Sequence, residues 1–240
     1  MNFLANPAQS LLVHGPMMAH WIASSRDRFT SADFDFLAAV LAPGDKRKHL
    51  TKLWDDPDAL REILDLKEVL RALLDSQSTL RVSPTFYFYV LVRHAFLDAD
   101  LTDADVADYV AGVLAKRIAT ASGDLLQDVA GGFTHAADFL AIISSAKGAM
   151  RFHLQIAAGN QFLVLSGLYP AFLKRRNDRH GAPDLEFYES FARQAFRSAA
   201  QSPNAPNDAP RQLLGSLADA MPTARRSLNR VAEEFVFLGD

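Results

Sequence analysis

Hydrophobic residues recur at helical spacing along almost the whole chain. The spacing is clearest near the C-terminus, where apolar side chains stand three or four positions apart: Ala224, Leu228, Val231, Phe235 and Leu238. This pattern places them on one face of an α-helix. Pro222 suits the first turn of that helix and Gly239 its end. The same spacing predicts helices over 103–118 and 183–200.

Capping residues refine several of these helices. Thr102 is the candidate N-cap of the helix over 103–118, with Asp105 in the acidic position of a capping box. Glu189 and Arg193 stand four residues apart in the helix over 183–200, which predicts an ion pair on its outer face. Asp56 and Pro57 form an N-cap and first-turn pair. The helix they open reaches about residue 75, with a bend near residue 65. Further short helices are expected over 16–25, 33–42 and 45–54, and after Asp124 and Thr134.

The stretch 85–92, Thr-Phe-Tyr-Phe-Tyr-Val-Leu-Val, has the composition of a β-strand. However, Ser83 and Pro84 are a typical helix start, and the apolar run continues through Leu97, which is long for a buried strand. No second strand candidate is available to pair with it, and an unpaired strand would leave its backbone groups unsatisfied. We therefore predict a buried helix over 84–97.

A second long apolar segment contains twenty uncharged residues, 154–173. That length is sufficient for a membrane span. Its polar residues would need partners in hydrocarbon, so a buried core helix over 147–173 is the favoured interpretation. Small residues at 157–159, 166 and 167 predict that a neighbouring helix approaches closely.

These elements predict an all-α fold, a bundle of about nine to eleven helices around residues 84–97 and 150–173. A chain of 240 residues is long enough to bury a full core and favours a single domain over 1–240. Three prolines in 201–210 predict a linker. The segment 211–239 is too short to fold alone and is expected to dock on the main body.

Composition excludes several classes of protein. The chain contains no cysteine, which excludes disulfide scaffolds, cysteine-ligated metals and thiol catalysis. A net charge of −3 with mixed signs does not favour nucleic-acid binding by the whole domain. The N-terminus lacks the basic start of a secretory signal, so a soluble cytoplasmic protein is expected.

Candidate site residues stand out where polar side chains interrupt the two buried helices. Arg93 and His94 follow the apolar run of the first, and Tyr87 lies two turns earlier. A buried arginine needs an anionic partner. The second helix supplies four further candidates, and all seven could converge if the helices are neighbours: Tyr87, Arg93, His94, Arg151, His153, Gln155 and Asn160. We expect Arg151 to be at least half-buried beside an anion. Bracing of the backbone remains an alternative role for each of them.

Other chemistry finds little support. The seven histidines include no i,i+4 pair, so no metal site or cofactor is expected. The acidic run from Asp98 to Asp108 lacks the glycine and glutamate of an EF-hand. Two basic clusters carry no recognition motif for nucleic acid: Lys174, Arg175, Arg176 and Arg179, and then Arg225, Arg226 and Arg230.

Several stretches resemble an uncharacterised family of all-helical bacterial proteins. These are residues 83–94, 159–163, 167–170, 183–188 and 235–239, for example Ser-Pro-Thr-Phe-Tyr-Phe-Tyr-Val-Leu-Val-Arg-His over 83–94. The resemblance covers most of residues 80–239. It implies a helical fold and an origin in the bacterial cytoplasm, and it implies no activity.

Two functions from different classes remain open. The first is a binding or interaction protein, for which regulation is one suitable role, because no catalytic motif has a known spacing. The alternative is an enzyme or small-molecule sensor with an anion-accepting pocket between the helices 84–97 and 150–173. The sequence patterns do not indicate whether the partner is a protein or a small molecule. They do not indicate the oligomeric state either.

Overall fold

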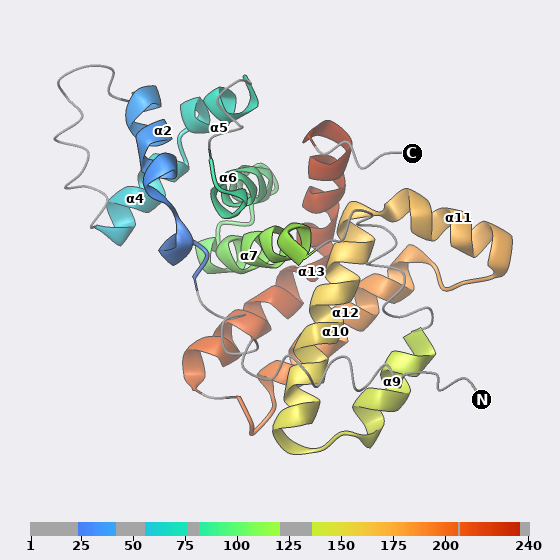
Figure 1. The fold of residues 1–240 in the computed structure, drawn as a ribbon. Coiled ribbons are helices and arrows are strands. Elements are labelled where there is room, and N and C mark those ends of the chain that lie inside the picture. Colours follow the sequence, from blue (N-terminus) through green and yellow to red (C-terminus); the bar gives the residue numbers. More distant parts are fainter. Residues whose placement is uncertain (1–23, 42–55, 76–81, 121–135, 206, 236–240) are drawn as a thin grey trace, which may run out of the picture. The chain divides into compact units, whose positions relative to one another are not determined.

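The computed structural model describes residues 24–41, 56–75, 82–120, 136–205 and 207–235 (Figure 1). Within them lie ten α-helices, one short 3-10 helix and no strand, and 83% of these residues are helical. The predicted all-α class is therefore confirmed. The chain divides into two compact units, residues 24–119 and residues 120–240 with 1–23. The single-domain arrangement stays a prediction.

Circular dichroism provides a direct check of the fold class. We expect the far-ultraviolet spectrum of the full chain to be dominated by helix, well above half of all residues, because 83% of the described residues are helical. A substantial sheet contribution would contradict the helical assignment of residues 84–97.

The unit of residues 24–119 is built around one buried helix. Its elements are η2 (Arg26–Arg28), α2 (Ser31–Leu41), α4 (Pro57–Leu64), α5 (Lys67–Leu74), α6 (Pro84–Leu97) and α7 (Ala104–Thr120). Helix α6 coincides with the predicted helix over 84–97, so the strand alternative is wrong. The hydroxyl of Ser83 caps α6 by accepting a hydrogen bond from the Phe86 amide at 3.1 Å. A helix satisfies its own backbone groups, which is why the aromatic run can be buried without a strand partner.

The predicted bend near residue 65 is a break between two helices. Asp56 accepts hydrogen bonds from the amides of Asp58 and Ala59, and so caps α4 as expected. Helix α4 ends at Leu64, and α5 starts at Lys67. The two intervening residues place the carboxylate of Asp65 beside α6, where it has a role described below.

The N-cap of α7 differs from the prediction. The carboxylate of Asp103 accepts hydrogen bonds from the amides of Asp105 and Val106 at 3.0 and 3.1 Å. Asp103, and not Thr102, therefore satisfies the first free amides of the helix. The backbone carbonyl of Thr102 instead accepts a hydrogen bond from Arg93.

The second unit contains five helices in its described part, α9 (Ala136–Ser145), α10 (Gly148–Leu168), α11 (Pro170–His180), α12 (Leu185–Ala200) and α13 (Asp208–Phe235). Helix α10 is its buried centre and packs against α9, α12 and α13 (Figure 1). Two glycines allow this close packing. A Cβ built on Gly159 would lie 2.5 Å from the ring of Phe196, and one on Gly167 would lie 2.9 Å from Leu228. The predicted close approach is therefore present at both positions.

The apolar segment 154–173 is interrupted. Helix α10 ends at Leu168 and α11 begins at Pro170, bent by 92° from it. Proline lacks the amide needed to continue a helix and constrains the residue before it, which explains the break. In the described part of the chain no single helix is long and apolar enough to cross a membrane, although this bent pair meets the length and composition together.

Helix α13 begins within the predicted linker and runs through Pro222, which was expected to open a new helix. Met221 and Ala224 on either side of the proline are fully buried. Packing of this face against α10 and α12 therefore sustains the helix despite the lost backbone hydrogen bond. The helix predicted after Thr134 is confirmed as α9. The predicted helices over 16–25 and 45–54 and the one after Asp124 lie wholly or largely outside the described residues.

Candidate functional site

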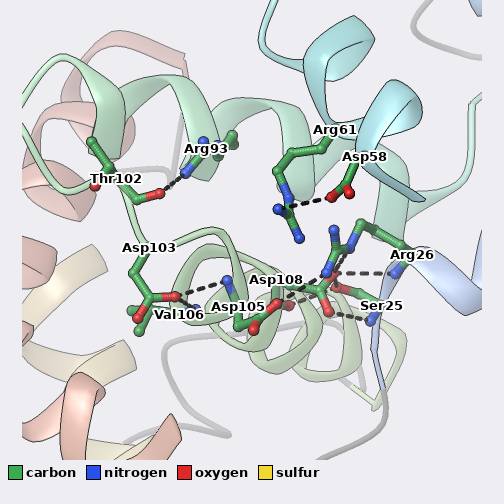
Figure 2. Close-up of polar contacts among 10 residues, drawn as sticks. All are labelled: Ser25, Arg26, Asp58, Arg61, Arg93, Thr102, Asp103, Asp105, Val106 and Asp108. Atoms are coloured by element: carbon green, nitrogen blue, oxygen red, sulfur yellow. Dashed lines mark hydrogen bonds and ion pairs between the residues drawn. The ribbon is translucent and has the colours of Figure 1, made fainter. Parts of the chain in front are cut away.

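Arg93 is buried in α6 and is fully engaged with its own unit. Its Nε and Nη2 donate to the two carboxylate oxygens of Asp65, each at 2.7 Å. Its Nη1 donates to the carbonyl of Thr102, also at 2.7 Å (Figure 2). A bidentate contact of this kind is the strongest geometry for an arginine and a carboxylate. The expected anionic partner of Arg93 is thus a residue of the chain.

His94 also has a partner within the same unit. Its Nε2 lies 3.0 Å from the carbonyl oxygen of Leu64, and the side chain is buried. Burial lowers the pKa of His94 from its ordinary value, while the hydrogen bond to Leu64 opposes that shift. The imidazole is therefore neutral at pH 7 and donates Nε2–H to the end of α4.

The lowered pKa of His94 predicts that acid destabilises the protein. The unfolded chain binds a proton to His94 more readily than the folded chain, so this contribution to stability is complete above the unfolded pKa of about 6.5 and is lost as the pH falls below it. We expect the urea concentration at the unfolding midpoint to decrease as the pH is lowered from about 7.5 to about 5.5. The decrease should be smaller in His94→Gln. His180→Gln is the control, because His180 is exposed. If His180→Gln reduced the loss of stability in acid as much as His94→Gln does, the loss would not arise from His94.

The hydroxyl of Tyr89 is the most unusual polar group of this unit. The side chain is fully buried, and its oxygen has no hydrogen-bond partner among the described residues. Burial raises the pKa of Tyr89 to about 12. The phenol therefore stays protonated at neutral pH. Tyr87, the tyrosine that the sequence suggested, is half-buried and its pKa is raised by burial as well.

Figure 2 shows charged residues from η2, α4, α6 and α7 of this unit. The guanidinium of Arg26 lies 5.9 Å from the ring centre of Tyr89 and pairs with Asp105 at 3.1 Å and Asp108 at 3.5 Å. The buried carboxylate of Asp108 also accepts hydrogen bonds from the amide and the hydroxyl of Ser25, at 3.0 and 2.6 Å. Carboxylates thus neutralise the arginines, so the arrangement braces the start of η2 against α7.

The candidates on α10 have different environments. Arg151 is exposed and forms no hydrogen bond or ion pair with another described side chain. The expectation that it is at least half-buried is therefore wrong. The next residue, Phe152, is buried, so Arg151 lies on the outer face of α10. His153 is half-buried, with a pKa lowered by burial, and Gln155 and Asn160 are buried.

The seven candidates divide between the two units. Tyr87, Arg93 and His94 belong to residues 24–119, and the four residues of α10 belong to the other unit. Within the first unit the bonds of Arg93 and His94 lead to different partners, the carboxylate of Asp65 and the carbonyl of Leu64. The convergence of all seven on one pocket stays a prediction.

A polar network in the second unit was missed by the sequence analysis. Arg225 of α13 donates to the carboxylate of Glu189 on α12 and, at 2.7 Å, to the side-chain oxygen of Asn229. Asn229 in turn donates to the carbonyls of Ser166 and Gly167 at 2.8 and 2.6 Å. These carbonyls end α10 and have no intrahelical partner. Glu189 thus pairs with Arg225, and the predicted pair with Arg193 is not formed.

Metal-ligating side chains do not gather in the part of the chain that the structure describes. Among these residues no group of three or more metal-ligating side chains comes together. The buried Arg93 and His94 of α6 are held by structural partners. Comparison of the chain with protein-family models, curated proteins and solved structures gives no match.

Proposed function

We propose that this chain is a non-catalytic binding or interaction protein of the bacterial cytoplasm. The observation that carries the proposal is the engagement of Arg93, whose three donated hydrogen bonds go to Asp65 and Thr102. An arginine used in this way is a brace and not an open anchor for a substrate. His94 supports the same interpretation, because its imidazole is committed to the carbonyl of Leu64.

A ligand screen by thermal unfolding tests the proposal. A ligand present at 100 times its dissociation constant stabilises a protein by about 2.7 kcal/mol, so a pocket for a metabolite is detectable in this way. We expect no anionic metabolite to stabilise the full chain through Arg151, the one exposed arginine among the candidate residues.

The variant Arg151→Met makes the screen specific. Because Arg151 has no described partner, its replacement should leave the stability of the free protein unchanged. Arg193→Met, another exposed arginine in the same unit, is the matched control. A metabolite that stabilises the parent chain and the control but not Arg151→Met would overturn the proposal in favour of the pocket alternative.

A further inference from the structure

Helix α11 carries exposed cations that have no described counter-charge. Lys174, Arg175 and Arg179 are exposed, and none of them has a hydrogen bond or ion pair with the residues that the structure describes. Arg176 is half-buried, with its guanidinium 5.7 Å from the ring centre of Phe172. We call Lys174, Arg175, Arg176 and Arg179 the α11 basic surface. The one acidic residue of the helix is Asp178.

The other basic cluster of the same unit, Arg225, Arg226 and Arg230 of α13, has carboxylate partners. Arg225 pairs with Glu189, and Arg230 lies 3.8 Å from the carboxylate of Glu234. The unit thus neutralises two of the three arginines of this cluster with its own carboxylates. Lys174, Arg175 and Arg179 of α11 have no equivalent pairing in the described residues, so the two clusters differ in environment.

Helix stability alone does not explain the α11 basic surface. The helix buries a single side chain, that of Leu173. Arg175 and Arg179 stand four residues apart, and like charges at that spacing destabilise a helix. The helix dipole favours cations in the last turn, which accounts for Arg179. It does not account for Lys174 and Arg175, which lie a turn earlier.

The size and character of the surface restrict the partner. Residues 174–179 extend over about 8 Å along the helix axis. Such a short surface contacts few phosphates, and nucleic-acid binding through few phosphates is weak at physiological salt. Ala171 is the sole exposed apolar residue of α11, whereas helices that lie on membranes insert a large apolar face. Arginine side chains pair well with carboxylates in bidentate geometry.

We propose that the α11 basic surface binds an acidic segment of a partner protein. The proposal rests on the proposed function, in that the partner is a protein, and it adds the surface and the chemistry. Carboxylates of the partner would pair with Arg175 and Arg179, one turn apart on the exposed side of the helix.

Fluorescence anisotropy of a labelled deca-glutamate peptide tests this binding at low salt. We expect the full chain to bind the peptide, and Arg175→Gln/Arg179→Gln to bind it about tenfold more weakly. The control, Arg193→Gln/Arg226→Gln, removes the same charge from exposed positions on α12 and α13 of the same unit. It should bind nearly as well as the parent chain. Unchanged melting temperatures would show that both variants are folded.

Three results would overturn the proposal. In the first, the parent chain does not bind the peptide. In the second, the control loses as much affinity for the peptide as the α11 variant does. In the third, a ten-nucleotide oligothymidylate or a phosphatidylserine vesicle binds α11 more tightly than the peptide does. These failures differ from failure of the proposed function. That function is overturned by metabolite stabilisation through Arg151, which the α11 variants do not alter.

Discussion

Replacement of Arg93 by methionine is expected to lower the free energy of unfolding by about 3 kcal/mol, because it leaves the carboxylate of Asp65 without its partner. The side chain of Arg93 is 5% exposed and that of Asp65 is 26% exposed, so both charges are largely shielded from water. Methionine fills a similar volume, and the loss therefore reports the broken pair and not a cavity. Urea unfolding at pH 7 measures it.

Arg71→Met is the matched control for this experiment. Arg71 is exposed on α5 in the same unit and has no described partner, so its replacement should change stability by less than about 0.5 kcal/mol. If Arg93→Met were as mild as this control, the guanidinium of Arg93 would not be holding Asp65. Its role as a brace would then be wrong.

The second large effect is expected at Gly159, where α10 meets α12. A Cβ at this position would lie 2.5 Å from the ring of Phe196, which is itself fully buried. Gly159→Leu must therefore displace the ring or the helix and should destabilise the protein by about 3 kcal/mol. Gly159→Ala should also destabilise it, although alanine has the higher helix propensity. Urea unfolding again provides the measurement.

At Gly215 on α13 we expect replacement by alanine to have the opposite effect on stability from Gly159→Ala. No heavy atom lies within 4 Å of a Cβ built there. Gly215→Ala should therefore stabilise the protein by up to about 1 kcal/mol, through helix propensity alone. If Gly159→Ala were neutral or stabilising like Gly215→Ala, the close packing of α10 on Phe196 would be wrong.

Local signals in the sequence were sufficient for much of the fold. The Ser83-Pro84 pair and the length of the apolar run identified α6, and the Asp56-Pro57 pair identified the start of α4. These features depend on residues a few positions apart, because interactions within one helix determine where it begins and how long it is. The small residues of α10 likewise predicted close packing, because a missing side chain has the same consequence in any bundle.

The pairings of charged residues could not be predicted in this way. Asp65 and Arg93 are 28 positions apart, and Ser25 and Asp108 are 83 apart. Periodicity contains no information about which elements meet and indicates only partners that are close in sequence. It therefore predicts Arg193 as the partner of Glu189, whereas the fold brings Arg225 to it.

Errors at helix ends have a related origin. Thr102 and Asp103 are both suitable N-caps by local rules, and in the fold the Asp103 side chain caps α7 while the Thr102 carbonyl accepts from Arg93. Pro222 is a helix start by local rules, yet burial of the flanking residues keeps it inside α13. Arg151 looked buried because the uncharged segment follows it, but burial begins one residue later, at Phe152.

A double-mutant cycle between Arg93 and Asp65 tests most directly whether the ionisable side chains of α6 are structural. We expect Arg93→Met and Asp65→Leu each to destabilise the protein, and the double variant to lose less stability than the sum of the two, with a coupling energy of about 2 kcal/mol. Replacing both charges removes the unpaired group that makes each single change costly. Additive effects of the two substitutions would contradict the account and would leave Arg93 available to bind a ligand.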